Sequence, residues 1–148
     1  MKLETKDLLT GDEISSKEFL ELIDFSIKLK EENKTVKGKQ LLENKTLAML
    51  FEKPSTRTRV SFETGMKQLG GHTIILSLNE MQHSRGESVE DTAKTLSGYV
   101  DGIMARVYEH SFIEDLAKHA TVPVINGLSN AYHPCQTLAD FMTIKEHK

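Results

Sequence analysis

Residues 46–69 read TLAMLFEKPSTRTRVSFETGMKQL, and the repeating unit of the predicted fold is visible in this stretch. Its first six residues form a short apolar run, which is typical of a strand buried on both faces of a parallel sheet. A polar turn follows, and from Ser55 onward apolar residues recur at helical spacing, at Val60, Met66 and Leu69. The stretch therefore predicts a strand, a polar turn and a helix in succession.

Three further apolar runs occupy residues 73–78, 102–108 and 122–126, and successive runs start 20 to 29 residues apart. These intervals suit strand–helix–strand units. Helix starts are marked by a serine three residues before an acidic residue, as in a capping box. Such pairs occur at Ser15 and Glu18, Ser88 and Asp91, and Ser111 and Glu114.

A last helix is predicted from Pro134, because proline suits the first helical position. The alternation predicts an α/β fold with three layers, α/β/α, around a four-stranded parallel sheet with right-handed crossovers, preceded by an N-terminal helix. Ligands of such sheets bind beyond the carboxyl ends of the strands.

The composition describes an ordinary globular domain. The chain has 148 residues, 38% hydrophobic and 28% charged, with a net charge of −3. We expect one domain, residues 1–148. A weakly acidic chain is a poor candidate for nucleic-acid binding, and no apolar run approaches the roughly 20 residues of a membrane helix. The single cysteine excludes a disulfide framework, and the first residues fit no targeting peptide. We therefore expect a cytoplasmic protein with neither nucleic-acid nor membrane partners.

The first polar cluster follows the first apolar run and reads Lys53-Pro54-Ser55-Thr56-Arg57-Thr58-Arg59. A helix N-terminus attracts anions, hydroxyls donate to them, and a guanidinium grips phosphate bidentately. This pattern favours a phosphate cradle, although neither glycine-rich nucleotide motif occurs. The alternative is simple capping by Ser55 with two solvated arginines. Arg57 and Arg59 lie about 200° apart on a helix, so Arg57 is the better ligand candidate and Arg59 a structural ion-pair partner.

Two other candidates follow later runs. Arg106 is a charge within an apolar strand, which is costly unless paired. It either serves a ligand at the strand end or forms a buried ion pair with Glu52 or Glu63. His133 opens the last helix, whose N-terminus disfavours a charged imidazole, so it is either a neutral donor to a carbonyl oxygen or a helix cap.

Gln136 shares a helix face with His133, since the two are three residues apart, and it offers both a donor and an acceptor. Cys135 faces elsewhere and is interpreted as a packing residue. Residues 79–87 form a polar loop in which Gln82, His83 and Arg85 either contact anions or are simply solvated. The remaining histidines show no metal-ligand spacing: His72, His110, His119 and His147.

Together these motifs resemble one family, the aspartate and ornithine carbamoyltransferases. Residues 55–59, S-T-R-T-R, match its carbamoyl-phosphate signature. Residues 133–136 match its H-P-x-Q motif, and Arg106 falls on its strand arginine. Residues 51–53 and 126–129 and the cysteine of H-P-C-Q are more similar to the ornithine branch. The resemblance covers essentially the whole chain and implies the strand order 2-1-3-4.

The resemblance also implies a role for each matching residue. Ser55, Thr56, Arg57 and Thr58 would bind the phosphate of carbamoyl phosphate. Arg106, His133 and Thr58 would hold the carbamoyl oxygen and would therefore be the catalytic residues. Gln136 would bind the carbamoyl amino group. Family members are trimers with sites at subunit interfaces, so Gln82 would act in the neighbouring subunit's site.

The implied reaction needs neither metal nor cofactor. The uncharged δ-amine of ornithine attacks the carbamoyl carbon, phosphate leaves and citrulline forms. The family's ornithine-binding motifs, D-x-x-x-S-M and H-C-L-P, do not occur in these 148 residues. We therefore expect the chain to be the carbamoyl-phosphate domain of a longer enzyme, with little or no turnover by itself.

Two alternatives remain open at this point. In the first alternative, the acceptor of the parent enzyme is putrescine, aspartate or an acylated ornithine rather than ornithine. In the other alternative, the chain is a non-catalytic anion-binding module that trimerises around phosphate.

Overall fold

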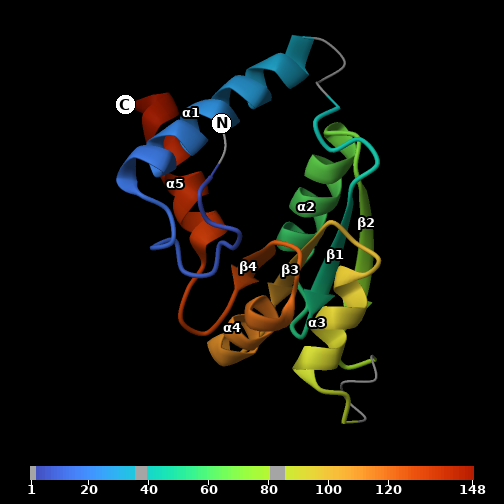
Figure 1. The fold of residues 1–148 in the computed structure, drawn as a ribbon. Coiled ribbons are helices and arrows are strands. Elements are labelled where there is room, and N and C mark those ends of the chain that lie inside the picture. The colour runs from blue at the N-terminus through green and yellow to red at the C-terminus, as the bar shows by residue number, and fades with distance from the viewer. Residues whose placement is uncertain (1–2, 36–39, 81–85) are drawn as a thin grey trace.

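The computed structural model describes residues 3–35, 40–80 and 86–148 of the chain. Helices and strands alternate after an N-terminal helix, as predicted (Figure 1). In chain order the elements are α1 (Ser16–Thr35), β1 (Thr46–Phe51), α2 (Thr56–Gln68), β2 (His72–Ser77), α3 (Val89–Ser97), β3 (Gly102–Arg106), α4 (His110–His119), β4 (Val124–Leu128) and α5 (Pro134–His147).

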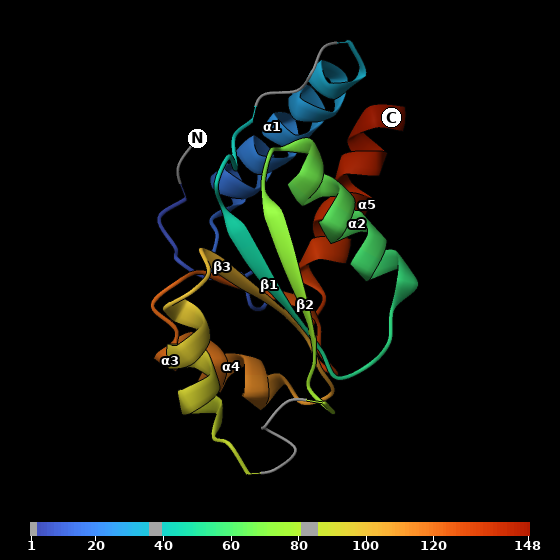
Figure 2. The same ribbon diagram turned by 90° about the vertical axis from the view of Figure 1, so that its right-hand side faces the viewer.

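The four strands form one parallel sheet in the order β2-β1-β3-β4, which confirms the predicted fold class and strand order (Figure 2). The strand β1 has the predicted bounds. The strand β4 begins two residues later than predicted, because Pro123 has no N–H to donate to the ladder. Its carbonyl still accepts from the N–H of Ile103, at 2.9 Å.

Helices cover both faces of the sheet (Figures 1 and 2). Helices α3 and α4 pack on one face, where the larger core cluster lies, and α2 covers Met49 and Met104 on the other. Helix α5 contacts β4, and α1 packs against α5. The expectation of burial on both faces is wrong for β2, because this strand lies at the sheet edge and leaves Ile74 44% exposed.

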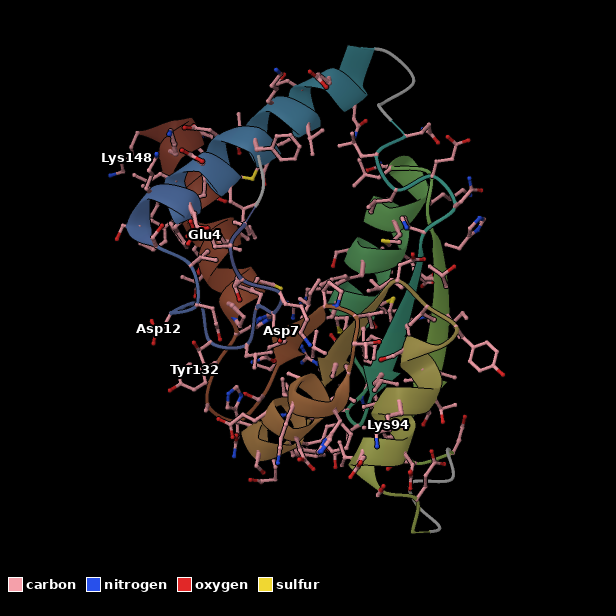
Figure 3. The ribbon with its side chains drawn as sticks, in the orientation of Figure 1. Glu4, Asp7, Asp12, Lys94, Tyr132 and Lys148 are labelled. Atoms are coloured by element: carbon pink, nitrogen blue, oxygen red, sulfur yellow. The ribbon has the colours of Figure 1, made fainter. Side chains whose placement is uncertain are left out.

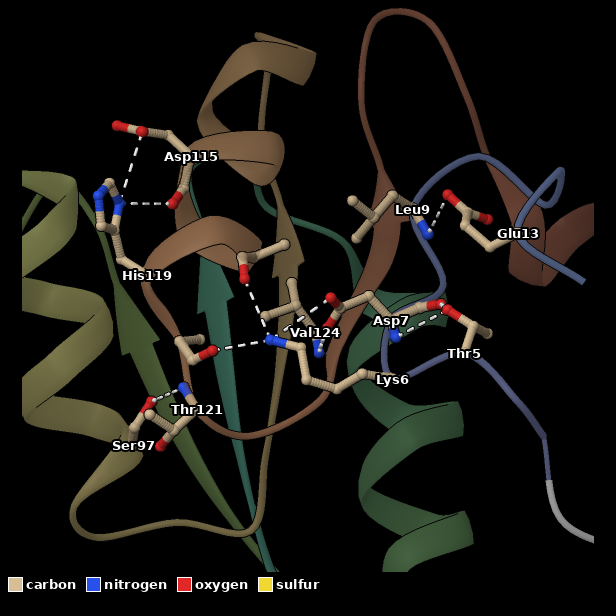
Figure 4. Close-up of polar contacts among 12 residues, drawn as sticks. Thr5, Lys6, Asp7, Leu9, Glu13, Ser97, Asp115, His119, Thr121 and Val124 are labelled. Carbon is tan, nitrogen blue, oxygen red and sulfur yellow. Dashed lines mark hydrogen bonds and ion pairs between the residues drawn. The ribbon is translucent and has the colours of Figure 1, made fainter.

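The N-terminal segment closes the opposite edge of the sheet (Figure 4). Leu8 forms a parallel bridge with Ile125 of β4, and the carboxylate of Asp7 accepts from the N–H of Val124 at 2.8 Å. The ammonium of Lys6 donates to the carbonyls at the end of α4, those of Ala117 and Ala120. None of the helices within the described ranges combines the length and the apolar character that crossing a membrane requires.

Two of the three helix starts predicted from a serine and an acidic residue are confirmed and one is wrong, and α5 begins at Pro134 as predicted. Ser15 and Glu18 form the reciprocal capping box of α1, and Ser88 caps α3. Helix α4 begins at His110 instead of after Ser111, without a side-chain cap of its own. Its first N–H donates to Asn130 Oδ1 at 3.1 Å. A tertiary acceptor thus replaces the local cap.

A bulge interrupts the pairing of β3 with β4. Ala105 pairs with Asn126 and Arg106 with Leu128, which leaves Gly127 as the extra residue. A methyl group on Gly127 would overlap Met104 Sδ and stand 3.3 Å from the carbonyl oxygen of Ala105. The close approach of the two strands therefore favours glycine at this position.

Gly127→Ala is expected to lower the free energy of unfolding by about 1–3 kcal/mol, because the methyl group would displace the fully buried side chain of Met104 and press on the Ala105 carbonyl. Gly65→Ala is the matched control. Nothing lies within 4 Å of a methyl group at this position in α2, so alanine should stabilise the chain by about 0.5–1 kcal/mol. Urea denaturation measures both changes. Equal stability of Gly127→Ala and the parent would contradict the packing argument.

Candidate functional site

The predicted clusters meet at the carboxyl edge of the sheet. Phe51, the last residue of β1, is paired with Arg106, the last residue of β3. Helix α2 begins shortly after β1, and α5 begins after β4, which is the other neighbour of β3. The sheet thus brings together the beginning of α2, the end of β3 and the beginning of α5, as expected for a ligand site of this fold class.

The beginning of α2 is locally ordered by its hydroxyls. Ser55 has an extended backbone at the N-cap, and its Oγ accepts from the N–H of Thr58 at 3.3 Å. The same hydroxyl donates to Thr58 Oγ1 at 3.1 Å, and Thr58 is only 9% exposed. Ser55 therefore caps α2. Thr56 and Arg57 are exposed beside it.

Arg106 crosses from β3 to α2, where its Nη1 donates to Thr58 Oγ1 at 3.1 Å. Its Nε is buried and has no hydrogen-bond partner among the described residues. Burial lowers the pKa of this guanidinium from its ordinary value. A buried donor without a partner is uncommon in proteins, and a bound ligand is one explanation for it.

The alternative of an ion pair from Arg106 to Glu52 or Glu63 is not what the structure shows. The carboxylate of Glu52 accepts from the N–H of Tyr108 at 2.7 Å. Glu63 pairs with Arg59 one turn earlier, at 3.1 Å. The prediction that Arg59 is a structural ion-pair partner is confirmed, and the described carboxylates leave the charge of Arg106 without a counterion.

His133 stands at the N-cap position of α5, but its ring makes no capping hydrogen bond. Its main-chain carbonyl accepts from the N–H groups of Gln136 and Thr137, which are the first hydrogen bonds of the helix. The capping alternative is thus wrong for the side chain. The Nδ1 atom is buried without a partner. Burial lowers the pKa of His133, the nearby Arg106 cation lowers it further, and Asp140 acts in the opposite direction. The ring is therefore neutral at physiological pH.

Gln136 and Cys135 differ in their surroundings. The Gln136 side chain is exposed, and its Nε2 donates to Asp140 Oδ1 at 2.8 Å. The Cys135 thiol donates to the carbonyl of Asn126 at 3.5 Å, and burial raises the pKa of this thiol to about 11. A thiol that keeps its proton is not a nucleophile at neutral pH, so the packing interpretation of Cys135 is confirmed.

The other candidates are not brought into this arrangement. Gln82, His83 and Arg85 lie outside the described residues. A groove of about 440 Å³ lies between α2 and β2 and touches Ser55 and Thr56, but it does not reach Arg106 or His133. Within residues 3–35, 40–80 and 86–148, no three metal-ligating side chains are grouped as a metal site would require.

One residue near the site is missing from the sequence interpretation. Asn126 is completely buried in β4 and hydrogen-bonds to the loop before His133. The available signal was a polar residue inside an apolar run, followed by glycine. That signal does not identify its partners, because one of them, Leu9, is 117 positions away in the chain.

Comparison with known proteins gives consistent matches. The family model described as "Aspartate/ornithine carbamoyltransferase, carbamoyl-P binding domain" matches residues 6–146. An ornithine carbamoyltransferase of Cenarchaeum symbiosum is 57% identical over 100% of this chain and 48% of its own length. One of Bacillus thuringiensis is 57% identical over 98% of this chain and 45% of its own.

The solved structures that resemble this fold include both branches of the family. An ornithine carbamoyltransferase from Pyrococcus furiosus superposes with a TM-score of 0.93 at 53% identity, over 99% of this chain and 47% of that one. The catalytic subunit of an aspartate transcarbamoylase from M. jannaschii gives 0.86 at 40% identity, over 96% and 47%. The chain spans about half the length of the relatives it matches.

We expect the pKa of His133 to lie below its ordinary value of about 6.5. Arg106→Gln should raise this pKa, because it removes a neighbouring cation. Asp140→Asn should lower it further, because it removes a neighbouring anion. NMR titration of the imidazole resonances measures all three values, with His133→Gln to assign the signal. Shifts of the same sign in both variants would contradict the electrostatic assignment.

Proposed function

The chain belongs to the aspartate/ornithine carbamoyltransferase family, and from this premise we propose that it binds carbamoyl phosphate at the carboxyl edge of its sheet. The observation that carries the proposal is the bond from Arg106 to Thr58. It joins the helix start that suits a phosphate to a guanidinium whose buried Nε suits a carbonyl oxygen, and His133 Nδ1 is likewise buried without a partner among the described residues.

In this proposal the phosphate lies at the N-terminus of α2. The first turn of a helix presents free N–H groups and the positive end of its dipole to an anion. Ser55, Thr56 and Thr58 add hydroxyl donors, and Arg57 adds an exposed guanidinium that is free to close on the ligand. The net charge of −3 does not oppose this, because the cationic groups are local.

Arg106, His133 and Thr58 are assigned to the carbamoyl oxygen, where negative charge develops as an amine attacks the carbon. A donor positioned for such an oxygen typically contributes about 2.7–4 kcal/mol to the transition state. A neutral imidazole suits this role, because its one N–H group can donate a hydrogen bond to the oxygen without transferring the proton. Gln136 is assigned to the carbamoyl amino group, which would donate to its Oε1 while its Nε2 keeps the bond to Asp140.

The proposed reaction of the whole enzyme is transfer of the carbamoyl group to the δ-amine of ornithine, which gives citrulline and phosphate. The residues that bind the acceptor are proposed to belong to the half of the relatives' length that this chain does not span. Ornithine is supported by residues 51–53 and 126–129, which are more similar to the ornithine branch, and by the names of the two curated relatives described above. Aspartate, putrescine and an acylated ornithine are the competing acceptors.

Assembly as a trimer, with Gln82 acting in a neighbouring site, is part of the same proposal and rests on the family resemblance. The second candidate function is a non-catalytic anion-binding module. It is favoured by the exposed Arg57 and the hydroxyls of α2, which suffice to hold a phosphate. The two functions differ in what they require of Arg106.

Isothermal titration calorimetry with carbamoyl phosphate tests the binding site. Arg57→Ala and Arg106→Ala are each expected to weaken binding about 10- to 100-fold, as hydrogen bonds to charged groups are worth about 1.5–3 kcal/mol. Arg59→Ala is the matched control, because Arg59 is already paired with Glu63, and its affinity should stay within about twofold. Unchanged affinity in Arg106→Ala alone would favour the simple phosphate-binding module.

The purified 148-residue chain, supplied with carbamoyl phosphate and ornithine, is expected to form no citrulline above the uncatalysed rate. The reason is that no group in the proposed site is assigned to the amino acid. A colorimetric citrulline assay measures this, with the ornithine carbamoyltransferase from Pyrococcus furiosus as the positive control. Citrulline formation by the chain itself would overturn the proposed division of the site.

A further inference from the structure

Asn126 is a buried polar residue close to the beginning of α5. It lies in β4 with an exposed fraction of 0%. A buried amide is costly unless its hydrogen-bonding groups are satisfied. Each of them is satisfied here, and their partners come from three different segments of the chain.

The amide of Asn126 has a single consistent orientation. Its Oδ1 accepts from the N–H of Leu128 at 2.9 Å. Its Nδ2 donates to the carbonyl of Leu9 at 2.7 Å and to the carbonyl of Tyr132 at 3.2 Å. Exchanging the oxygen and nitrogen would place an acceptor against two carbonyls, so the orientation follows from the partners.

The bond to Tyr132 acts directly on the site, because the Tyr132 carbonyl belongs to the peptide group that precedes His133. Tyr132 itself lies in the loop between β4 and α5 (Figure 3). The same carbonyl accepts from the N–H of Ser129 at 3.0 Å, and Ser129 Oγ accepts from the N–H of Tyr132 at 3.1 Å. The N–H and the carbonyl of Tyr132 are therefore both held by hydrogen bonds. These bonds fix the direction in which the backbone enters His133.

The bond to Leu128 acts on the other side of the site. The bulge at Gly127 leaves the N–H of Leu128 outside the ladder, and Asn126 Oδ1 satisfies it. Leu128 is the residue paired with Arg106, and its carbonyl accepts from the N–H of Val107 at 3.0 Å. One side chain thus stabilises the backbone opposite Arg106 and the backbone before His133.

We propose that Asn126 is a positioning residue of the site: its amide holds the Tyr132–His133 peptide and the β4 bulge, and thereby sets the direction of His133 relative to Arg106. The consequence for ligand binding rests on the proposed function, whereas the effect on His133 does not. A purely structural asparagine would contribute stability and leave the folded environment of His133 unchanged.

The test compares Asn126→Ser with Asn130→Ser in the 148-residue chain. A serine at 126 is too short to bridge Leu9 and Tyr132. Asn130 is the matched control in the same loop, because its side chain bonds His110 and Glu109 and not the peptide before His133. Both changes are uncharged, so neither alters the charge near the imidazole. Asn126→Thr, closer in volume and suited to a strand, is the second variant if Asn126→Ser does not fold.

NMR titration of His133 is the primary readout, taken under conditions where circular dichroism shows a folded chain. We expect its pKa to rise toward the ordinary value in Asn126→Ser or Asn126→Thr, because the ring leaves its buried place beside Arg106. In Asn130→Ser it should match the parent. An unchanged His133 pKa in the folded Asn126 variants would overturn the proposal.

Affinity for carbamoyl phosphate is the second readout, with about tenfold weaker binding expected in the Asn126 variants and parental affinity in Asn130→Ser. If the parent chain does not bind carbamoyl phosphate, the proposed function fails. The His133 titration still decides the role of Asn126 in that case. Parental affinity in a folded Asn126 variant would contradict the positioning role.

Discussion

The parallel pairing of β1 with β3 is the constraint on which the site depends. Parallel alignment places the carboxyl ends of both strands at one edge, and the register pairs Phe51 with Arg106. The N–H of Glu52 continues this pairing by donating to the carbonyl of Arg106 at 2.9 Å. Because α2 begins a few residues later, the guanidinium of Arg106 reaches Thr58, which is 48 positions earlier in the chain.

The electrostatics of the site depend on the groups that surround Arg106. The carboxylates that were candidates for neutralising it are engaged elsewhere, Glu52 by a main-chain N–H and Glu63 by Arg59. A hydroxyl oxygen stabilises the cation without cancelling its charge. Burial, together with the remaining positive field, lowers the pKa of His133. Both effects favour the uncharged imidazole, and a cation near an uncharged imidazole suits an electron-rich oxygen.

Local patterns predicted what depends on neighbours in the chain. The strand β1 and the capping box of Ser15 and Glu18 were predictable, since hydrophobic continuity and a three-residue spacing determine them. The start of α4 was not predictable in this way, because Asn130 supplies its cap from another loop. The environment of Arg106 was predicted as a choice between ligand and ion pair. Only the fold reveals that the carboxylates have other partners.

Asn126 is a second example of what could not be predicted from sequence patterns. Its residue type and its place in an apolar run were visible, but its function depends on three carbonyl and amide groups that only the tertiary structure assembles. Sequence patterns of period 2 or 3.6 describe which face of an element is buried. They do not identify the distant backbone groups to which a buried polar side chain will hydrogen-bond. The partners of such side chains therefore cannot be predicted from these patterns.

The strand order explains why these features converge at one place. From β1 the chain moves outward to β2, then returns past β1 to β3 and moves outward in the opposite direction to β4. The order therefore reverses between β1 and β3. At such a switch point the connections leave toward opposite faces, α2 on one and α4 on the other, and a crevice opens between them. Arg106 ends β3 at this switch point, so the topology, rather than any single residue, brings its guanidinium and the beginning of α2 to the same edge of the sheet.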